Sequence, residues 1–466
     1  MRWNSFNRAA IAALSAETIY ILWLLQHTIG WPGIIYFLLE LSLFLLFALF
    51  LFNHSARKYI LIGGSYSFRP YVDIFIPTVN EPKSLVRKTV QAALAIPYPN
   101  KTVYLLDDGN RSSFRQLADE LGCIYTHRPN TVEKHYKAAN LNYGLTQSRG
   151  TFILTIDADH VVRPEILDDL LGHFKDPLVA VVATRQGFTI PLGNFNHDHT
   201  FYEYMQSGKN SNNSAISCGS GAVYRRTALE TIGGFQEWNL VEDLYTSFVL
   251  HQHGFRSIYS GQRYSKGHAP EDLPTICKQR WVWAYDTLRM FFWRMPLCAR
   301  SLTPRQRLHY FEIGYGYLVS ALTVPGLVLF NTYIVVQNVD IITNWPIFLA
   351  LKVLSFLLIL RFYAMLDQGT QSSRMWAALF LVYAAAALRA LWYPKPTYHP
   401  TPKHRSKKPP WLFALPHLSI LTLLSGSLLF HVYYYGTTIL LGIHLFWFAV
   451  LIYWFSPVLS LGFRRT

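Results

Sequence analysis

Long apolar runs lie near both ends of the chain, and a block of mixed polarity separates them. Residues 9–28 and 33–53 each reach the roughly 20 apolar residues that a helix needs to cross a bilayer, although Glu17 weakens the first run. Further apolar runs lie at 314–337, 345–364, 374–393, 412–431 and 437–459. We expect two membrane helices in 1–60, a folded domain in 61–300, and interfacial and membrane helices in 301–466.

The block 61–300 alternates short strand patterns with helical patterns. Strands are predicted at VDIFIPTVN (72–80), KTVYLLDD (101–108), TFILTIDAD (151–159) and LVAVVATR (178–185). Helical patterns lie between them, at 82–95 and 111–122. This alternation predicts an α/β domain with a parallel sheet covered on both faces. Ligands of such sheets bind beyond the carboxyl ends of the strands, where the acidic motifs lie.

Basic residues indicate how the chain crosses the membrane. The segment 394–410 holds five lysines and arginines without an acid, so the positive-inside rule places it in the cytoplasm, together with Arg464 and Arg465. If 374–393 also crossed the bilayer, this basic segment would emerge outside. We therefore expect 374–393 to be interfacial or re-entrant, which leaves two spans before the block and four after it.

Composition excludes some classes of protein. The chain is 51% hydrophobic and 15% charged, which favours a membrane protein, and its net charge is +15. Long apolar runs separate the basic clusters, so a nucleic-acid binder fits poorly. The four cysteines form no CxxC pair, and we expect neither a disulfide nor a zinc site: Cys123, Cys218, Cys277 and Cys298. The N-terminus does not resemble a cleaved signal.

The motif IDADH (156–160) is the strongest candidate for a metal site. Asp157 and Asp159 follow a predicted strand, one residue apart, where two carboxylates can share a hard cation. Mg²⁺ or Mn²⁺ takes oxygen ligands and neutralises a diphosphate leaving group. A solvated loop with two acids is the alternative.

The motif LLDDG (105–109) is a candidate nucleotide site. Asp108 could accept a hydrogen bond from a base, and Glu81 of the upstream VDIFIPTVNE could face the base or ribose. Taken alone, Asp-Gly after a strand is better explained as a turn.

The motif LVEDLY (240–245) supplies a candidate general base. An inverting sugar transfer needs a carboxylate that takes the proton from the incoming hydroxyl. Asp243 is the candidate, with Glu242 beside it. Both acids would also stabilise the first turn of the helix that follows.

The motif KQRWVWA (278–284) offers a cation and an aromatic surface. Arg280 could clamp a diphosphate and Trp281 could stack under a sugar ring. An interfacial helix with Trp and Arg at headgroup level is the alternative, and it is strongest for Trp283.

Two further segments are weaker candidates for substrate contacts. HYKAANLN (135–142) places Lys137 and Asn140 near the phosphates, although it is also an ordinary helix start. CGSG (218–221) would let the backbone approach an acceptor, and a simple turn is the alternative.

In this order, these motifs resemble those of the processive family 2 inverting glycosyltransferases, above all bacterial cellulose synthase catalytic subunits and related β-glucan synthases. The resemblance covers about 70–300 and continues to YHPTPK (398–403), which is similar to the family's gating-loop signature. It implies a GT-A domain, a UDP-sugar donor and a magnesium or manganese ion held by Asp157 and Asp159, with His160 beside them. It also implies the catalytic pair Asp243 and Glu242. The substrate-binding residues it implies are Thr78, Glu81, Asp108, Lys137, Asp157, Cys218, Gly219, Ser220, Arg280, Trp281, Tyr398, Thr401 and Lys403.

The chain departs from the family pattern in three places. Cys277 stands where the family has the Gln of QxxRW, which puts acceptor contacts in doubt. VED replaces TED, and Pro400 and Pro402 stiffen the gating loop. No regulatory domain is expected after the last helix.

The resemblance implies a plasma-membrane enzyme with a cytoplasmic catalytic domain. It would polymerise a sugar, with glucose as the family's choice, into a β-linked polysaccharide and translocate the product, with accessory export subunits as candidate partners. One alternative is a non-processive transferase that adds a single sugar to a membrane lipid. Another is a transporter or scaffold with a degenerate catalytic block, against which the intact Asp157, Asp159 and Asp243 argue.

Overall fold

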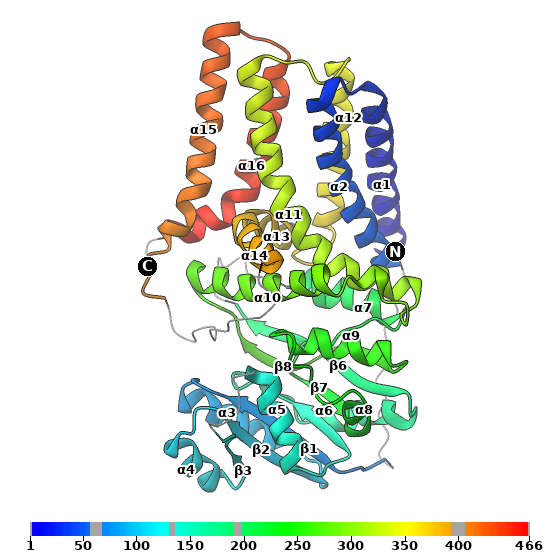
Figure 1. The fold of residues 1–466 in the computed structure, drawn as a ribbon, viewed down its shortest axis with the longest axis vertical. Coiled ribbons are helices and arrows are strands. Elements are labelled where there is room, and N and C mark those ends of the chain that lie inside the picture. Colours follow the sequence, from blue (N-terminus) through cyan, green and yellow to red (C-terminus); the bar gives the residue numbers. More distant parts are fainter. Residues whose placement is uncertain (1, 56–67, 130–135, 191–197, 393–405, 465–466) are drawn as a thin grey trace.

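The computed structural model describes residues 2–55, 68–129, 136–190, 198–392 and 406–464. Long helices form one end of the molecule and a sheet with its covering helices forms the other (Figure 1). Three helices, α10, α13 and α14, lie between the two ends. The predicted α/β domain inserted between membrane helices is therefore confirmed.

The sheet has eight strands in the order β3-β2-β1-β4-β7-β6-β8-β5. Their bounds are β1 Val72–Thr78, β2 Lys101–Asp107, β3 Ile124–Thr126, β4 Phe152–Thr155, β5 Val161–Val162, β6 Val179–Thr189, β7 Ala222–Arg225 and β8 Arg256–His268. The helices of this domain are α3 Lys83–Leu94, α4 Ser112–Leu121, α5 Tyr136–Gln147, α6 Ile166–Leu170, α7 Gln206–Asn210, α8 Arg226–Thr231, α9 Glu242–Gln252 and α10 Leu273–Trp293. Shorter helical turns are η1 Leu171–Lys175, η2 Thr200–Met205 and η3 Pro296–Cys298.

The sheet is mixed, and the prediction of a parallel sheet is wrong for its second half. Strands β3, β2, β1 and β4 are parallel to one another, but β7 runs antiparallel to both β4 and β6, and β5 antiparallel to β8. Strand β8 is parallel to β6. Strand propensity describes how a segment fits a pleated surface and carries no information on direction, which is chosen by pairing with distant segments.

Apolar packing on both faces of the sheet fixes the carboxyl ends that carry the acidic motifs. All seven residues of β1 are buried, as expected for a strand covered on both faces. On one face α3 buries Val86 and Val90 against it. On the other face α5 approaches so closely that a Cβ on Gly144 would come within 2.9 Å of Leu106. The carboxyl ends of β1 and β2 are therefore held between packed helices on both faces of the sheet.

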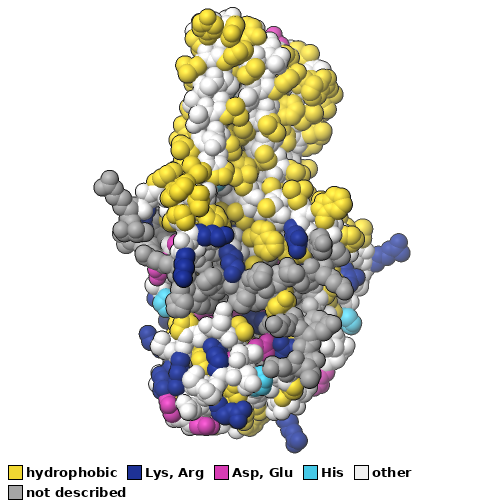
Figure 2. Space-filling view, turned by 60° about the vertical axis from the view of Figure 1, so that its left-hand side comes forward, with side chains coloured by type: hydrophobic (Ala, Val, Ile, Leu, Met, Phe, Trp, Pro, Cys, Tyr) yellow, Lys and Arg dark blue, Asp and Glu magenta, His cyan; other side chains and the backbone are white. Residues whose placement is uncertain are grey.

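Six helices within the described ranges are long and apolar enough to cross a bilayer. They belong to α1 Arg2–His27, α2 Gly30–Ser55, α11 Pro304–Gln337, α12 Trp345–Ala364, α15 Trp411–Tyr435 and α16 Leu440–Gly462. Exposed leucines such as Leu322 (58%) and Leu429 (70%) face outward from these helices, as lipid contact requires. Figure 2 shows hydrophobic side chains covering this end, while Lys and Arg lie at the junction and on the other end.

The helices α13 Gly369–Ala378 and α14 Phe380–Trp392 form a pair bent by 57°. The predicted apolar run 374–393 falls on this pair, which would raise the number of spans to seven if it crossed as one unit. Instead of standing beside the long helices, the pair lies at the base of the bundle next to α10 (Figure 1). That it does not cross the membrane stays a prediction.

Buried polar contacts join the two ends of the molecule. Lys209 of α7 donates to the Glu312 carboxylate (2.8 Å) and to the His309 carbonyl (2.6 Å), both on α11. Asn53 of α2 also donates to Glu312. Gly208 packs against the Asn53 carbonyl so tightly that no Cβ would fit there. The sheet domain is thus docked on both α2 and α11.

Candidate active site

A cavity of about 860 Å³ lies beyond the carboxyl end of β4, between α9, α10 and α11. The candidate catalytic and metal residues Asp157, Asp159, Glu242 and Asp243 all line it. Ile313 and Tyr317 of the long helix α11 line it too, which places the membrane bundle at its wall. The acidic motifs therefore meet at the boundary between the sheet domain and the bundle.

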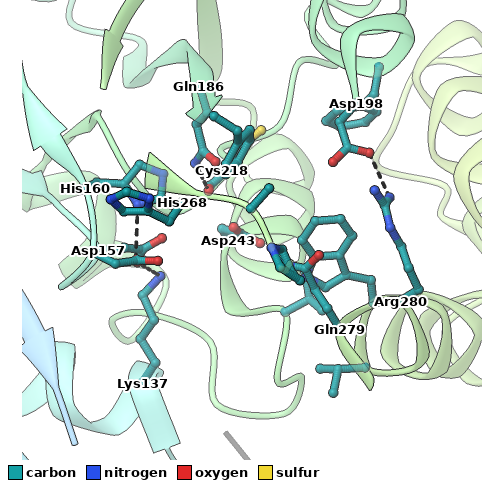
Figure 3. A pocket seen from close by; sticks show the side chains of 18 of the residues that line it. Lys137, Asp157, His160, Gln186, Asp198, Cys218, Asp243, His268, Gln279 and Arg280 are labelled. Carbon is teal, nitrogen blue, oxygen red and sulfur yellow. Dashed lines mark hydrogen bonds and ion pairs between the residues drawn. The ribbon is translucent and has the colours of Figure 1, made fainter. Parts of the chain in front are cut away.

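Lys137 ties two of the acidic motifs together. Its ammonium group is 2.7 Å from Asp157 Oδ1 (Figure 3). It is also 2.9 Å from Glu242 Oε1. Burial alone would lower the pKa of Lys137, but the carboxylates of Asp157, Glu242 and Asp243 outweigh it and raise that pKa. The lysine therefore stays a cation in the cavity.

Asp243 lies in the first turn of α9, where its Oδ1 accepts from the Leu244 amide at 2.6 Å. Gly219 has φ +82°, and a Cβ there would come within 2.9 Å of Asp243 Oδ2 and 2.8 Å of Lys137 Nζ. Only glycine fits this conformation and this space. Burial, followed by the neighbouring Glu242 carboxylate, raises the pKa of Asp243 to about 8. A carboxyl with a raised pKa is a stronger proton acceptor once ionised.

The carboxylates of the cavity could bind a divalent cation whose remaining coordination positions are filled by substrate oxygens. Asp157, Asp159, Glu242 and Asp243 are among the carboxylates that line the cavity, and Lys137 pairs with Asp157 and Glu242. Among the described residues, no group of three or more acids, histidines or cysteines converges on one point. A cation on Asp157 and Asp159 would thus need further oxygens, and Mg²⁺ commonly takes them from substrate phosphates and water.

The CGSG segment and Asp159 are held by a buried polar network. Asp157 N donates to Ser220 Oγ at 3.1 Å, and Gln186 donates to the Cys218 and Ser220 carbonyls. His160 lies 3.3 Å from Asp159 Oδ1. Burial raises the pKa of the Cys218 thiol. The Cys218 thiol is therefore neutral, and its backbone carbonyl is held by Gln186.

The predicted nucleotide residues lie outside the cavity lining and have partners of their own. Glu81 accepts from the Thr78 hydroxyl (2.7 Å) and the Val79 amide (2.8 Å). Asp108 forms a two-point pair with Arg128, both contacts at 2.9 Å. A nucleotide that used Asp108 would share or displace that arginine. Their role in binding a uridine stays a prediction.

Asn140 has a structural contact. It is buried and donates to the Leu106 carbonyl of β2 at 2.8 Å. It fixes α5 to the sheet, and Lys137 on the same helix is the residue that reaches the cavity.

The helical period of α10 separates the residues of the KQRWVWA segment. Cys277 and Trp281, four apart, face the apolar layer shared with α14, where the Trp281 ring stacks on Tyr285 at 4.9 Å. Arg280 and Trp283 line the cavity instead. The structure thus places Trp283, and not Trp281, among the cavity residues.

Arg280 has a partner that the sequence analysis did not identify. Its guanidinium is 2.7 Å from the Asp198 carboxylate and lies over the Trp283 ring at 4.8 Å (Figure 3). Other cavity residues that the motifs did not include are Gln186, His268, Glu271, Asp272 and Gln279. The only sequence signal for Gln279 was its position one residue before Arg280. Tyr398, Thr401 and Lys403 lie outside the described residues.

Comparison with known proteins agrees with this geometry. Residues 73–233 match the family described as Glycosyl transferase family 2, and residues 231–377 match the one described as Cellulose synthase. The chain is 34% identical over 321 residues to the cellulose synthase catalytic subunit [UDP-forming] of Xanthomonas axonopodis pv. citri, covering 64% of this chain and 44% of that one. It is 37% identical over 254 residues to the Pseudomonas fluorescens subunit of the same name, covering 52% and 34%.

A solved structure has the same fold. The mannosyltransferase PcManGT from Pyrobaculum calidifontis, in complex with GDP-Man and Mn2+, superposes with a TM-score of 0.57 at 17% identity, covering 83% of this chain and 99% of that one. The fold and the family matches make the chain similar to family 2 glycosyltransferases, in a protein whose described residues include six helices that could cross a membrane. Within that class it resembles bacterial cellulose synthase catalytic subunits, and it spans less than half the length of the curated relatives it matches.

Proposed function

We propose that this protein is a processive glycosyltransferase, which adds sugars from a UDP-sugar to a β-linked polysaccharide and passes the product through its membrane helices. One observation carries the proposal: Asp243 and the Asp157–Asp159 pair line a single cavity whose wall includes Ile313 and Tyr317 of the long helix α11. A product made there would start at the base of the bundle.

In the proposed reaction, Asp243 accepts the proton of a hydroxyl on the terminal sugar of the acceptor. The freed oxygen attacks the anomeric carbon of the donor, the bond from that carbon to the diphosphate breaks, and UDP leaves. Because attack comes opposite the leaving group, an α-linked donor gives a β-linkage. Lys137 and Arg280 supply positive charge near the diphosphate.

Asp157 and Asp159 would hold a Mg²⁺ or Mn²⁺ ion, which when bound neutralises the charge of the diphosphate leaving group. Asp157 pairs with Lys137 in the structure, so the lysine would turn toward the donor phosphates when that carboxylate binds the ion. Glu242 holds the other side of Lys137 and keeps the ammonium between the metal motif and the base.

The proposal includes the setting that the resemblance implies. The protein lies in the plasma membrane with its catalytic domain in the cytoplasm, on the same side as the basic segment 394–410. Thr78, Glu81 and Asp108 bind the uridine, and Tyr398, Thr401 and Lys403 belong to a loop over the donor. The sugar is glucose, and accessory export subunits are candidate partners.

Purified protein incubated with a panel of UDP-sugars tests the proposal. We expect UDP release with one donor, a β-linked product ladder, and loss of both in Asp243→Asn. A single-sugar lipid product without a ladder would support the non-processive alternative. No UDP release with any donor in the presence of Mg²⁺ or Mn²⁺ would exclude both.

A further inference from the structure

Gln279 lies on the face of α10 that meets the cavity. The cavity residues of this helix include Thr275, Gln279, Arg280, Trp283 and Thr287, which follow the three- and four-residue spacing of one helical face. This face contains no acid. Cys277 and Trp281 lie on the other face, in the layer shared with α14. Gln279 is the amide side chain that this face offers, beside the hydroxyl groups of Thr275 and Thr287, and Figure 3 shows it in the same cavity as Asp243.

The Gln279 amide oxygen is buried and has no hydrogen-bond partner among the described residues. A buried carbonyl without a donor is unfavourable, and such groups normally have one. An amide oxygen at the wall of a polar cavity can accept a hydrogen bond from a hydroxyl group of a substrate. A sugar offers these in pairs on adjacent carbons, and an amide can both accept from one and donate to the next.

The charged residues near Gln279 already have other interactions or another role in the proposed reaction. Arg280 pairs with Asp198 and covers one face of Trp283, so its guanidinium is held in place on that side of the cavity. On the other side, Asp243 is the proton acceptor of the proposed reaction. Figure 3 shows Gln279 between Asp243 and the Arg280–Asp198 pair. A sugar whose hydroxyl reaches Asp243 would present a neighbouring hydroxyl to the Gln279 amide.

We propose that Gln279 determines acceptor specificity: its amide oxygen accepts a hydrogen bond from a hydroxyl of the acceptor's terminal sugar, next to the hydroxyl that Asp243 deprotonates. This inference rests on the proposed function and deepens it, because it names the residue that selects which hydroxyl is extended. Sites that hydrogen-bond a substrate hydroxyl reject analogues that lack it far more strongly than apolar pockets do.

Three full-length variants test the inference. Gln279→Met keeps the length of the side chain without its polar atoms, and Gln279→Glu keeps an acceptor oxygen. Gln262→Met is the matched control, since Gln262 is an exposed glutamine on β8 outside the cavity lining. Each protein is given the preferred UDP-sugar with cello-oligosaccharides, and with methyl β-glucosides that each lack one hydroxyl. Donor hydrolysis without acceptor and thermal unfolding are measured in parallel.

We expect Gln279→Met to raise the acceptor KM at least tenfold, with a smaller effect on donor hydrolysis. We also expect it to lose the discrimination against one particular deoxy acceptor, which Gln279→Glu retains in part and the Gln262 variant retains fully. Unchanged discrimination among deoxy acceptors in Gln279→Met, or an equal fall in elongation and hydrolysis, overturns the inference while leaving the proposed function intact. A wild-type protein that releases no UDP overturns the proposed function and this inference with it.

Discussion

Two groups of buried charges lie close to the base of α11, and they differ in balance and surroundings. At the domain junction Lys209 (0% exposed) and Glu312 (2% exposed) form a one-to-one pair packed among helices. In the cavity, by contrast, three carboxylates, those of Asp157, Glu242 and Asp243, surround Lys137, whose side chain and that of Asp157 remain 28% and 29% exposed. Paired charges without access to solvent hold the parts of the molecule together, whereas an excess of one sign facing a cavity is available for ligands and protons.

The pKa values of the two lysines, Lys209 at the junction and Lys137 in the cavity, shift in opposite directions. Burial lowers the pKa of Lys209, and Glu312 opposes that shift without reversing it. The Lys137 pKa moves upward, because several carboxylates surround that lysine. The cavity thus retains a cation-attracting field that the junction lacks.

Asp243→Asn should give the largest effect on function. We expect transfer to fall about 10³- to 10⁴-fold, the upper range for loss of a general base, with little change in thermal unfolding. UDP release and product length measure it. If the variant elongated at more than a tenth of the wild-type rate, Asp243 would not be the base.

Lys209→Met should give the largest effect on stability. It leaves the Glu312 carboxylate buried without its cation, and breaking such a pair costs about 3–5 kcal/mol in the free energy of unfolding. The double variant Lys209→Met with Glu312→Gln should recover most of that loss, as followed by thermal unfolding in detergent. Equal losses in the single and double variants would contradict a role for the ion pair.

Asp157→Asn should weaken the binding of the activating metal ion. Loss of one carboxylate ligand should raise the Mg²⁺ or Mn²⁺ concentration for half-maximal activity by about 10- to 100-fold, the range known for changes around metal ligands. Titration of the cation after chelation measures this. Asp176→Asn, which alters an exposed ion pair with Arg256, is the control and should follow the wild type.

The pH profile should locate the base. Because the Asp243 pKa is raised, the residue is protonated and inactive at low pH, so kcat/KM should rise with pH through the folded-state pKa and then level off. Glu242→Gln removes a cause of that upward shift, and the acid limb should move to lower pH. A limb that stayed in place would show that Glu242 does not act on Asp243.

Thr303→Ala should give the smallest effect. Thr303 caps α11 by accepting from the Gln306 amide at 3.3 Å, while its own amide donates to Gln306 Oε1 at 2.9 Å. Loss of such a cap costs about 1 kcal/mol. We expect a small drop in thermal stability with unchanged metal dependence. A large loss of activity would mean that the position of α11 at the cavity wall depends on its cap.

The acidic residues of the cavity could be located from the sequence because they follow directly from local pattern. Asp157 and Asp243 stand at the end of a strand and in the first turn of a helix, and both boundaries are visible in the sequence. The Asp198 partner of Arg280 could not be found this way, because it comes from a distant segment with no motif. The same holds for Gln279, whose role depends on which face of α10 meets the cavity.

The sequence by itself determined the candidate membrane helices, four of the eight strands and the acidic loops, because hydrophobic runs and periodicity are properties of neighbouring residues. Tertiary structure alone decided the direction of β7, the packing of Cys277 and Trp281 in the layer shared with α14, and the docking of Lys209 on Glu312. Those outcomes depend on which distant surfaces exclude water together, and no local pattern specifies that choice.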